Sequence, residues 1–188
     1  GMPDVGIMTL AENAANAGAM AQASGLPVFA DADTGYGNAL NVRRTVMEFE
    51  RAGVAAIMIE DQVSPKRCGM LEGKRVVSPQ EMEGKVKAAV DARLDEDFVI
   101  CARTDARAVE GLASAIKRAE LYQKAGADVI FVEGPKTIAE AEEIARAIDI
   151  PLLYNVTPTG SVPPLDVKTL ERIGFRLLSC SVCMPVSY

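Results

Sequence analysis

The sequence has 188 residues, a net charge of −6, 49% hydrophobic residues and only 5% aromatic residues. This length favours one domain, and a core that must be built from Ala, Val, Ile and Leu is typical of helices packed on parallel strands. The acidic balance and the lack of a basic stripe argue against a nucleic-acid partner, and no apolar run approaches the ~20 residues of a membrane span.

The chain contains no histidine, which removes Ser-His and Cys-His pairs and most transition-metal sites from consideration. Acid–base chemistry must then use carboxylates, Lys, Tyr or Cys, and a bound metal is expected to be a hard cation held by oxygens. Cys68, Cys101, Cys180 and Cys183 show no disulfide framework, which favours a cytoplasmic location. The lone CxxC at 180–183 makes zinc or redox use improbable.

Short apolar runs alternate with amphipathic stretches along the chain. Strands are predicted over 26–30, 55–59, 97–102, 128–132, 151–155 and 175–180. Helical spacing of apolar residues predicts helices over 41–52, 110–125 and 137–148, and Ser78 is expected to cap another helix. Segments 51–60 and 124–133 both read as a helix end, a Gly, a strand and a Glu, with a degenerate copy at 171–180. Such repetition indicates βα units.

This α/β pattern fits either a doubly wound sheet or a (β/α)8 TIM barrel. The barrel is favoured because polar residues end five different predicted strands, and barrel enzymes build their sites from that face. These residues are Asp31, Glu60, Arg103, Glu133 and Asn155. Six strand units are present where a barrel of about 250 residues has eight. We therefore expect residues 1–188 to form a single barrel domain that is incomplete, with a front portion absent.

Several acids would crowd the mouth of such a barrel, namely Asp31, Asp33, Glu60, Asp61 and Glu133. Like charges held close together raise one another's pKa. A divalent cation relieves this repulsion, and ligation by carboxylates and water is typical of Mg²⁺. The alternative interpretation is that each acid caps a helix or lies in a turn. The Gly-x-Gly stretch at 35–37 is a weak phosphate motif and fits a tight turn capped by an asparagine equally well.

Segment 63–79 is a polar loop too long for an ordinary βα connection, and long loops at this face are often lids. It carries Cys68 next to Lys66 and Arg67, and nearby cations lower the pKa of a thiol. Cys68 is thus a candidate acid/base or nucleophile, the alternative being a surface cysteine without a role. Cys101 lies in an apolar strand and is expected to be inert.

The motifs GMPDVG (1–6), DADTGYGN (31–38), IEDQ (59–62), PKRCG (65–69), ARTDA (102–106) and VEG (132–134) resemble the isocitrate lyase/phosphoenolpyruvate mutase superfamily in order and spacing. The resemblance spans the chain, and KRCG resembles the lyase branch, with 2-methylisocitrate and 2,3-dimethylmalate lyases most similar. It implies a (β/α)8 barrel in a homotetramer, with a swapped C-terminal helix. It also implies that the strands present are 3–8, with the first two strands missing.

The resemblance also assigns roles to residues. Asp31 would bind Mg²⁺ (or Mn²⁺) directly, while Asp33, Glu60 and Glu133 would hold it through waters. Arg103 would bind the substrate's carboxylate or oxyanion, and Cys68 would be the catalytic acid/base. The remaining substrate contacts would come from Asp4, Gly69 and Asn155.

One residue departs from the family pattern, because Met70 stands where the lyases usually have a histidine. This shifts the expectation from a tricarboxylate toward a smaller substituted malate. The expected reaction is Mg²⁺-dependent cleavage of a small 2-hydroxy di- or tricarboxylate into a 2-oxo acid and a carboxylic acid. Alternatives are a mutase, hydrolase or decarboxylase acting on a phosphonate or oxaloacetate, and a non-catalytic barrel subunit.

Overall fold

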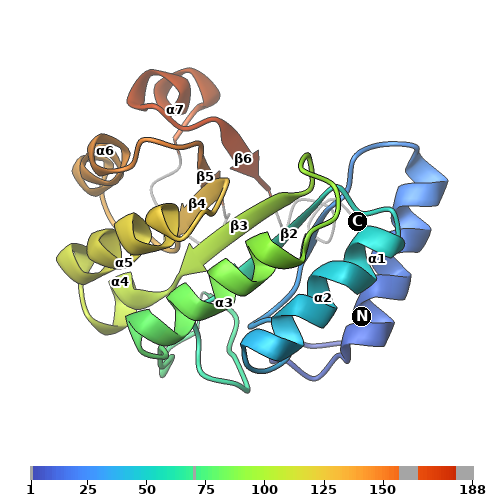
Figure 1. The fold of residues 1–188 in the computed structure, drawn as a ribbon. Coiled ribbons are helices and arrows are strands. Elements are labelled where there is room, and N and C mark those ends of the chain that lie inside the picture. The colour runs from blue at the N-terminus through green and yellow to red at the C-terminus, as the bar shows by residue number, and fades with distance from the viewer. Residues whose placement is uncertain (1, 70, 157–164, 181–188) are drawn as a thin grey trace.

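The computed structural model describes residues 2–69, 71–156 and 165–180, and these form a parallel six-stranded sheet. The strands are β1 (Phe29–Asp31), β2 (Ala56–Glu60), β3 (Val99–Thr104), β4 (Val129–Val132), β5 (Leu152–Asn155) and β6 (Leu177–Ser179). Their order in the sheet is their order in the sequence (Figure 1). A doubly wound sheet reverses its strand order at a switch point. The observed order is that of a curled, incomplete barrel, as predicted.

Helices lie between the strands in the chain and cover the outside of the sheet (Figure 1). They are α1 (Leu10–Ser24), α2 (Ala39–Arg51), α3 (Pro79–Ala92), α4 (Ala106–Val109), α5 (Leu112–Lys124), α6 (Ile138–Ala147) and α7 (Val167–Ile173). The predicted helices at 41–52, 110–125 and 137–148 correspond to α2, α5 and α6. Ser78 caps α3 by accepting a hydrogen bond from the backbone N–H of Glu81, as expected.

Alternation of side chains along each strand separates two apolar clusters. One face of the strands packs against the helices in the larger cluster, with fully buried residues such as Ile57, Ile100 and Ile130. The opposite face forms a smaller cluster of Cys101, Val129, Phe131 and Leu153, with Met58, Val99 and Leu177 packed against it. The second cluster lies on the concave side, which is the interior of a barrel. Cys101 is fully buried there, as predicted.

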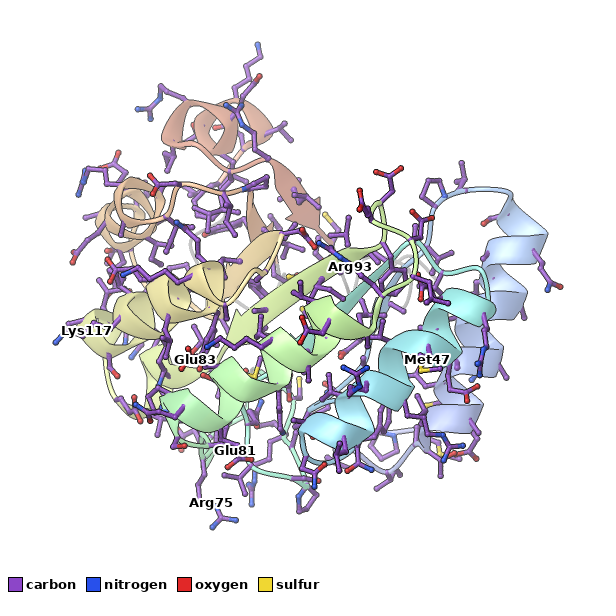
Figure 2. All side chains as sticks on the ribbon, viewed as in Figure 1. Met47, Arg75, Glu81, Glu83, Arg93 and Lys117 are labelled. Carbon is purple, nitrogen blue, oxygen red and sulfur yellow. The ribbon has the colours of Figure 1, made fainter. Side chains whose placement is uncertain are left out.

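The two ends of the sheet differ in their connections. Arg93 lies at the end where β3 begins, and Arg75 projects from the long loop at the opposite end (Figure 2). This loop, residues 61–78, connects β2 to α3 and lies where the strands finish. Within the described residues, no helix is long and apolar enough to cross a membrane. The completion of the barrel by two earlier strands stays a prediction.

The packing of α2 on the sheet generates a stability prediction. Phe49 is fully buried in the larger cluster, whereas Leu40 on the same helix is 75% exposed. Phe49→Ala in the whole protein should lower the free energy of unfolding by about 3–5 kcal/mol, because it removes buried apolar surface and leaves a cavity. Urea unfolding followed by circular dichroism measures this. Leu40→Ala is the matched control, and equal effects of the two changes would contradict the packing described here.

Candidate active site

The inward-facing side chains at the carboxyl ends of the strands surround a cavity of about 500 Å³. Register places Glu60 beside Arg103 and Asn155 beside Ser179, so the last inward position of neighbouring strands is polar. The cavity is lined by Asp4, Phe29, Ala30, Asp31, Met58, Cys68, Gly69, Arg103, Phe131, Glu133, Leu153, Asn155 and Ser179. Seven of the nine predicted site residues are in this lining. Asp33 and Glu60 are not part of it, but Asp33 lies 3.0 Å from Lys66 and Glu60 lies 3.3 Å from Arg103 of the lining.

A buried lysine lies among the acids of β1 and the N-terminal segment. The Lys66 side chain is only 2% exposed, and its ammonium contacts a carboxylate oxygen of Asp4 and lies 3.0 Å from Asp33 and 3.9 Å from Asp31. Burial alone would lower the pKa of Lys66, but the carboxylates around it, led by Asp31 and Glu60, raise it above its usual value. Lys66 is thus a fixed positive charge in the predicted acidic cluster.

Glu60 is only 1% exposed and is more deeply buried than the acids that line the cavity. Its pKa is raised to about 8, chiefly by burial and partly offset by the positive charge of Arg103. The guanidinium Nη1 lies 3.3 Å from Oε2, yet neither Glu60 oxygen accepts a hydrogen bond within the part of the chain that the structure describes. Buried carboxylate oxygens ordinarily have partners. Glu60 therefore has acceptor capacity available for a ligand, water or ion.

Arg103 is held by carboxylates on several sides. Its Nε and Nη2 donate to the two oxygens of Asp105 at 2.9 and 3.1 Å, and Nη2 lies 3.6 Å from Glu133. The guanidinium carbon also lies 5.3 Å from the ring centre of Phe131, a cation–π distance. Burial raises the pKa of Glu133, while Arg103 counteracts this effect. Arg103 is therefore fixed in orientation before any ligand binds.

The structure corrects the prediction that Asp61 lies at the barrel mouth. Asp61 is fully buried on the helix side of the sheet, where it accepts hydrogen bonds from Thr104 Oγ1 at 2.7 Å and Tyr122 OH at 2.8 Å. Arg118 Nη1 lies 3.3 Å from the same carboxylate. The physical reason is alternation along the chain, because Glu60 points inward and its neighbour must point outward. Asp61 is a structural ion-pair residue.

The loop carrying Cys68 approaches the strand ends closely. A Cβ added at Gly69 would lie 2.5 Å from Arg103 Nη2 and 2.8 Å from the Glu133 carboxyl carbon, so a side chain there would have to displace Arg103 or Glu133. The loop's amide contacts include Gln62 Nε2 donating to the Arg67 carbonyl at 2.8 Å. Cys68 is partly buried and borders the cavity. Activation of its thiol by Lys66 and Arg67 stays a prediction, since Lys66 pairs with acids and Arg67 donates to the Glu72 carbonyl.

The described acids fit a cation held by few direct ligands. Among the described residues, no three acids lie close enough together to hold a metal ion by direct contacts alone. The available oxygens belong to Asp31, which is exposed, and to Glu60, whose oxygens have no hydrogen-bond partner among the described residues; Asp4 is exposed too, but it pairs with Lys66. Mg²⁺ commonly takes one or two carboxylates and keeps several waters. The donor set thus fits a Mg²⁺ ion that keeps several waters, and the role of each acid stays a prediction.

Some polar groups of segment 31–41 form the turn between β1 and α2. The Asp31 carboxylate accepts a hydrogen bond from the Asp33 N–H at 2.8 Å, and Asp33 and Tyr36 have φ angles of 48° and 60°. Asn38 caps α2 by accepting from the N–H groups of Leu40 and Asn41. The asparagine-capped turn predicted for 35–38 is therefore present. The turn uses one oxygen of Asp31, and the other oxygen lies 3.9 Å from the Lys66 ammonium.

Sequence reasoning missed three residues of this site. The sequence treats Lys66 only as a neighbour of Cys68, yet it lies in the loop after β2, which pairs with β1, and could have been interpreted as the counter-charge of the β1 acids. Asp105 follows Arg103 by two residues, which is the spacing of an ion pair around a strand end. Ser179 lines the cavity at the end of β6 and carries no signal beyond its position. Met70 and Cys183 lie outside the described residues.

Comparisons with known proteins agree with this geometry. The family model "Phosphoenolpyruvate phosphomutase" matches residues 1–185. A 2,3-dimethylmalate lyase from Eubacterium barkeri is 50% identical over 94% of this chain and 61% of its own length. A 2-methylisocitrate lyase from Aeropyrum pernix is 49% identical over 94% of this chain and 57% of its own length. The chain thus spans about 60% of the length of these relatives.

Two solved structures are similar in fold. An oxaloacetate acetylhydrolase in complex with 3,3-difluorooxalacetate superposes with a TM-score of 0.95 at 38% identity, covering 99% of this chain and 64% of its own. A phosphonopyruvate hydrolase in complex with oxalate and Mg²⁺ superposes with a TM-score of 0.83 at 31% identity, covering 99% of this chain and 66% of its own. With the six motifs and the parallel, curled sheet, these matches show that the chain belongs to the phosphoenolpyruvate phosphomutase/isocitrate lyase family.

Proposed function

We propose that the protein containing this chain is a carbon–carbon lyase that cleaves a small 2-hydroxy di- or tricarboxylate, of alkylmalate or 2-methylisocitrate type, into a 2-oxo acid and a carboxylic acid. The observation that carries the proposal is one cavity lined by Asp31, Arg103, Glu133 and the Cys68–Gly69 segment. Its acids suit a metal, its arginine suits a carboxylate, and its thiol suits proton transfer. The similarity to two lyases supports the same reaction class.

Mg²⁺, for which Mn²⁺ can substitute, would be held by Asp31 directly and by Asp33, Glu60 and Glu133 through water. When bound, it polarises the hydroxyl and carboxylate oxygens of a 2-hydroxy acid. The similarity to a structure that contains oxalate and Mg²⁺ supports this assignment.

Arg103 would bind the carboxylate that gains negative charge as the carbon–carbon bond breaks. Its guanidinium is already oriented by Asp105 and Phe131, and a preorganised cation stabilises developing charge without reorganising. Cleavage would begin when a base takes the proton of the 2-hydroxyl group and the carbon–carbon bond breaks. Cys68, which borders the same cavity, would then give its thiol proton to the α-carbon of the enolate that is left. Gly69, Asp4 and Asn155 would contact the substrate or its ordered waters.

A second candidate is hydrolysis of oxaloacetate on the same scaffold. It is favoured by the similarity to oxaloacetate acetylhydrolase, whose fold matches with a TM-score of 0.95. Phosphonate chemistry is a weaker candidate, because a cysteine at position 68 is not expected in mutases. We further propose a cytoplasmic homotetramer, in keeping with the family resemblance.

The lyase proposal predicts 2-oxo acid release from a hydroxy acid. The whole protein should release a 2-oxo acid from 2,3-dimethylmalate, another alkylmalate or 2-methylisocitrate in the presence of Mg²⁺, and EDTA should abolish the release. A coupled lactate dehydrogenase assay measures pyruvate directly, and product identity is checked by mass spectrometry. Turnover of oxaloacetate alone would favour the hydrolase, and no turnover of any of these acids would contradict the lyase assignment.

Cys68→Ser should lower kcat by about 10²–10⁴-fold, the usual contribution of a positioned acid or base, because a serine hydroxyl is a much weaker acid. Mg²⁺ affinity and thermal stability should stay near those of the unchanged protein. Cys180→Ser, at an exposed cysteine, is the matched control. Near-normal turnover of Cys68→Ser would remove this thiol from the chemistry.

Asp31→Ala should abolish metal-dependent turnover and weaken Mn²⁺ binding by at least about 10-fold, since it removes the single direct ligand. Isothermal titration calorimetry with Mn²⁺ gives the affinity without relying on activity. Asp149→Ala, at an aspartate outside the cavity, serves as the control. An unchanged Mn²⁺ affinity would place the direct ligand elsewhere.

A further inference from the structure

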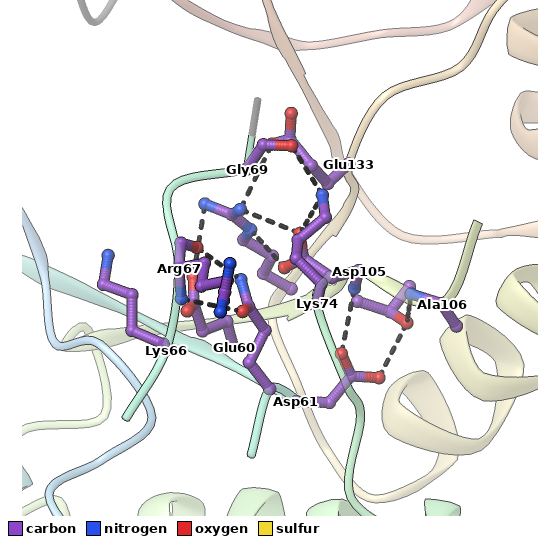
Figure 3. Close-up of polar contacts among 12 residues, drawn as sticks. Glu60, Asp61, Lys66, Arg67, Gly69, Lys74, Asp105, Ala106 and Glu133 are labelled. Atoms are coloured by element: carbon purple, nitrogen blue, oxygen red, sulfur yellow. Dashed lines mark hydrogen bonds and ion pairs between the residues drawn. The ribbon is translucent and has the colours of Figure 1, made fainter. Parts of the chain in front are cut away.

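Lys74 connects the loop that carries Cys68 to the end of β3. Its side chain is 4% exposed, and its ammonium donates to the Gly69 carbonyl at 2.5 Å and to Asp105 Oδ1 at 2.8 Å (Figure 3). Burying a lysine is costly unless its charge is paired. Both partners of Lys74 belong to groups that shape the candidate active site. The lysine therefore has a defined position rather than a solvated one.

Asp105 is shared between Lys74 and Arg103. It is fully buried, and it accepts hydrogen bonds from Arg103 Nε and Nη2 as well as from Lys74. Burial would raise the pKa of Asp105, but Arg103 and Lys74 lower it below its usual value. Its own backbone N–H donates to the Asp61 carboxylate at 2.9 Å. One carboxylate, fixed by the structural network behind the sheet, thus orients two cations at once.

The Gly69 backbone lies so close to Arg103 and Glu133 that a side chain at residue 69 would have to displace one of them. Cys68 is bonded to Gly69, so the distance between the thiol and the strand ends depends on where the Gly69 carbonyl is held. In the described loop, Lys74 holds that carbonyl from the opposite side of the turn. A small displacement of a catalytic group can cost orders of magnitude in rate.

We propose that Lys74 is a positioning residue: paired with Asp105, it fixes the Gly69 carbonyl and thereby keeps Cys68 at the cavity beside Arg103. The catalytic meaning of this arrangement rests on the proposed lyase function, whereas the arrangement itself does not. The competing interpretation is that Lys74 only neutralises Asp105. That role would leave the position of Cys68 unchanged when Lys74 is replaced.

The test is the rate of alkylation of Cys68 by iodoacetamide in the whole protein, followed by mass spectrometry of its peptide. Lys74→Met should speed alkylation of Cys68 about fivefold or more, because a group protected by a local contact reacts through open conformers that become more populated. Alkylation of the exposed Cys180 should not change, and the fully buried Cys101 should stay unmodified. Lys87→Met, which breaks the exposed pair with Glu83, is the control variant.

Catalysis supplies a second, separate readout. Lys74→Met should lower kcat about 10-fold or more through the displaced thiol while the Mn²⁺ affinity stays within about twofold, because the metal ligands are not touched. Lys74→Arg, which keeps a charged donor, should restore much of the protection of Cys68. Should Lys74→Met also expose Cys101, Lys74→Gln replaces it in the comparison with the same expectation.

Unchanged Cys68 alkylation in a folded Lys74 variant would overturn the positioning role, whatever the activity. Faster alkylation of Cys68 without any detectable lyase turnover in the unchanged protein would instead leave the positioning role standing and count against the proposed function. The two proposals can therefore fail independently.

Discussion

Placing several carboxylates at one end of a parallel sheet requires positive charge in the same place, and this constraint governs the whole candidate site. The strand order places the ends of β1 to β6 along one edge of the sheet, so Asp31 and Glu133 line one cavity and Glu60 lies beside Arg103 of that cavity. Uncompensated, such charges would cost several kcal/mol each. The compensating cations are Lys66 and Arg103, and they come from separate segments of the chain. Because Lys66 belongs to the loop between β2 and α3, its ion pairs with the acids also help to hold that loop on the sheet.

Two acids that are adjacent in the sequence, Glu60 and Asp61, have different roles in the structure. Glu60 lies beside Arg103 with free acceptor capacity, whereas Asp61 faces the helices and accepts hydrogen bonds from Thr104, Tyr122 and a backbone N–H. A buried carboxylate whose oxygens all accept hydrogen bonds is held rigidly and has no free acceptor for a ligand. An unsaturated one beside a cavity is suited to bind an ion, water or substrate group. Strand alternation alone decides which of the two adjacent acids takes which task.

Much of this arrangement could be predicted from the sequence. The six strands and their parallel order followed from the apolar runs, and four cavity-lining residues followed from the polar positions that end them: Asp31, Arg103, Glu133 and Asn155. Cys68 followed from the long loop that carries it, whereas Asp4 and Gly69 followed from the family resemblance alone. The side of the sheet that Asp61 faces was mispredicted because the end of β2 was placed at residue 59 and alternation was not applied beyond it. The partners of Lys66 and Lys74 could not be predicted, since the contact between a loop lysine and a distant aspartate depends on loop conformation and not on any periodic pattern.

The walls of the cavity restrict what the proposed substrate can look like. Its polar rim comes from the strand ends, while Phe29, Met58, Phe131 and Leu153 supply an apolar floor. A 2-hydroxy acid would meet both surfaces at once, with its carboxylates at the rim and its alkyl substituent on the floor. Contacts with such a floor distinguish two substrates that differ by one methylene by only about 1–3 kcal/mol. A substrate that lacks a carboxylate leaves the polar groups of the rim without a partner, and the loss of binding energy is then far larger. The site should therefore select strictly for the 2-hydroxy acid group and only loosely for its alkyl chain.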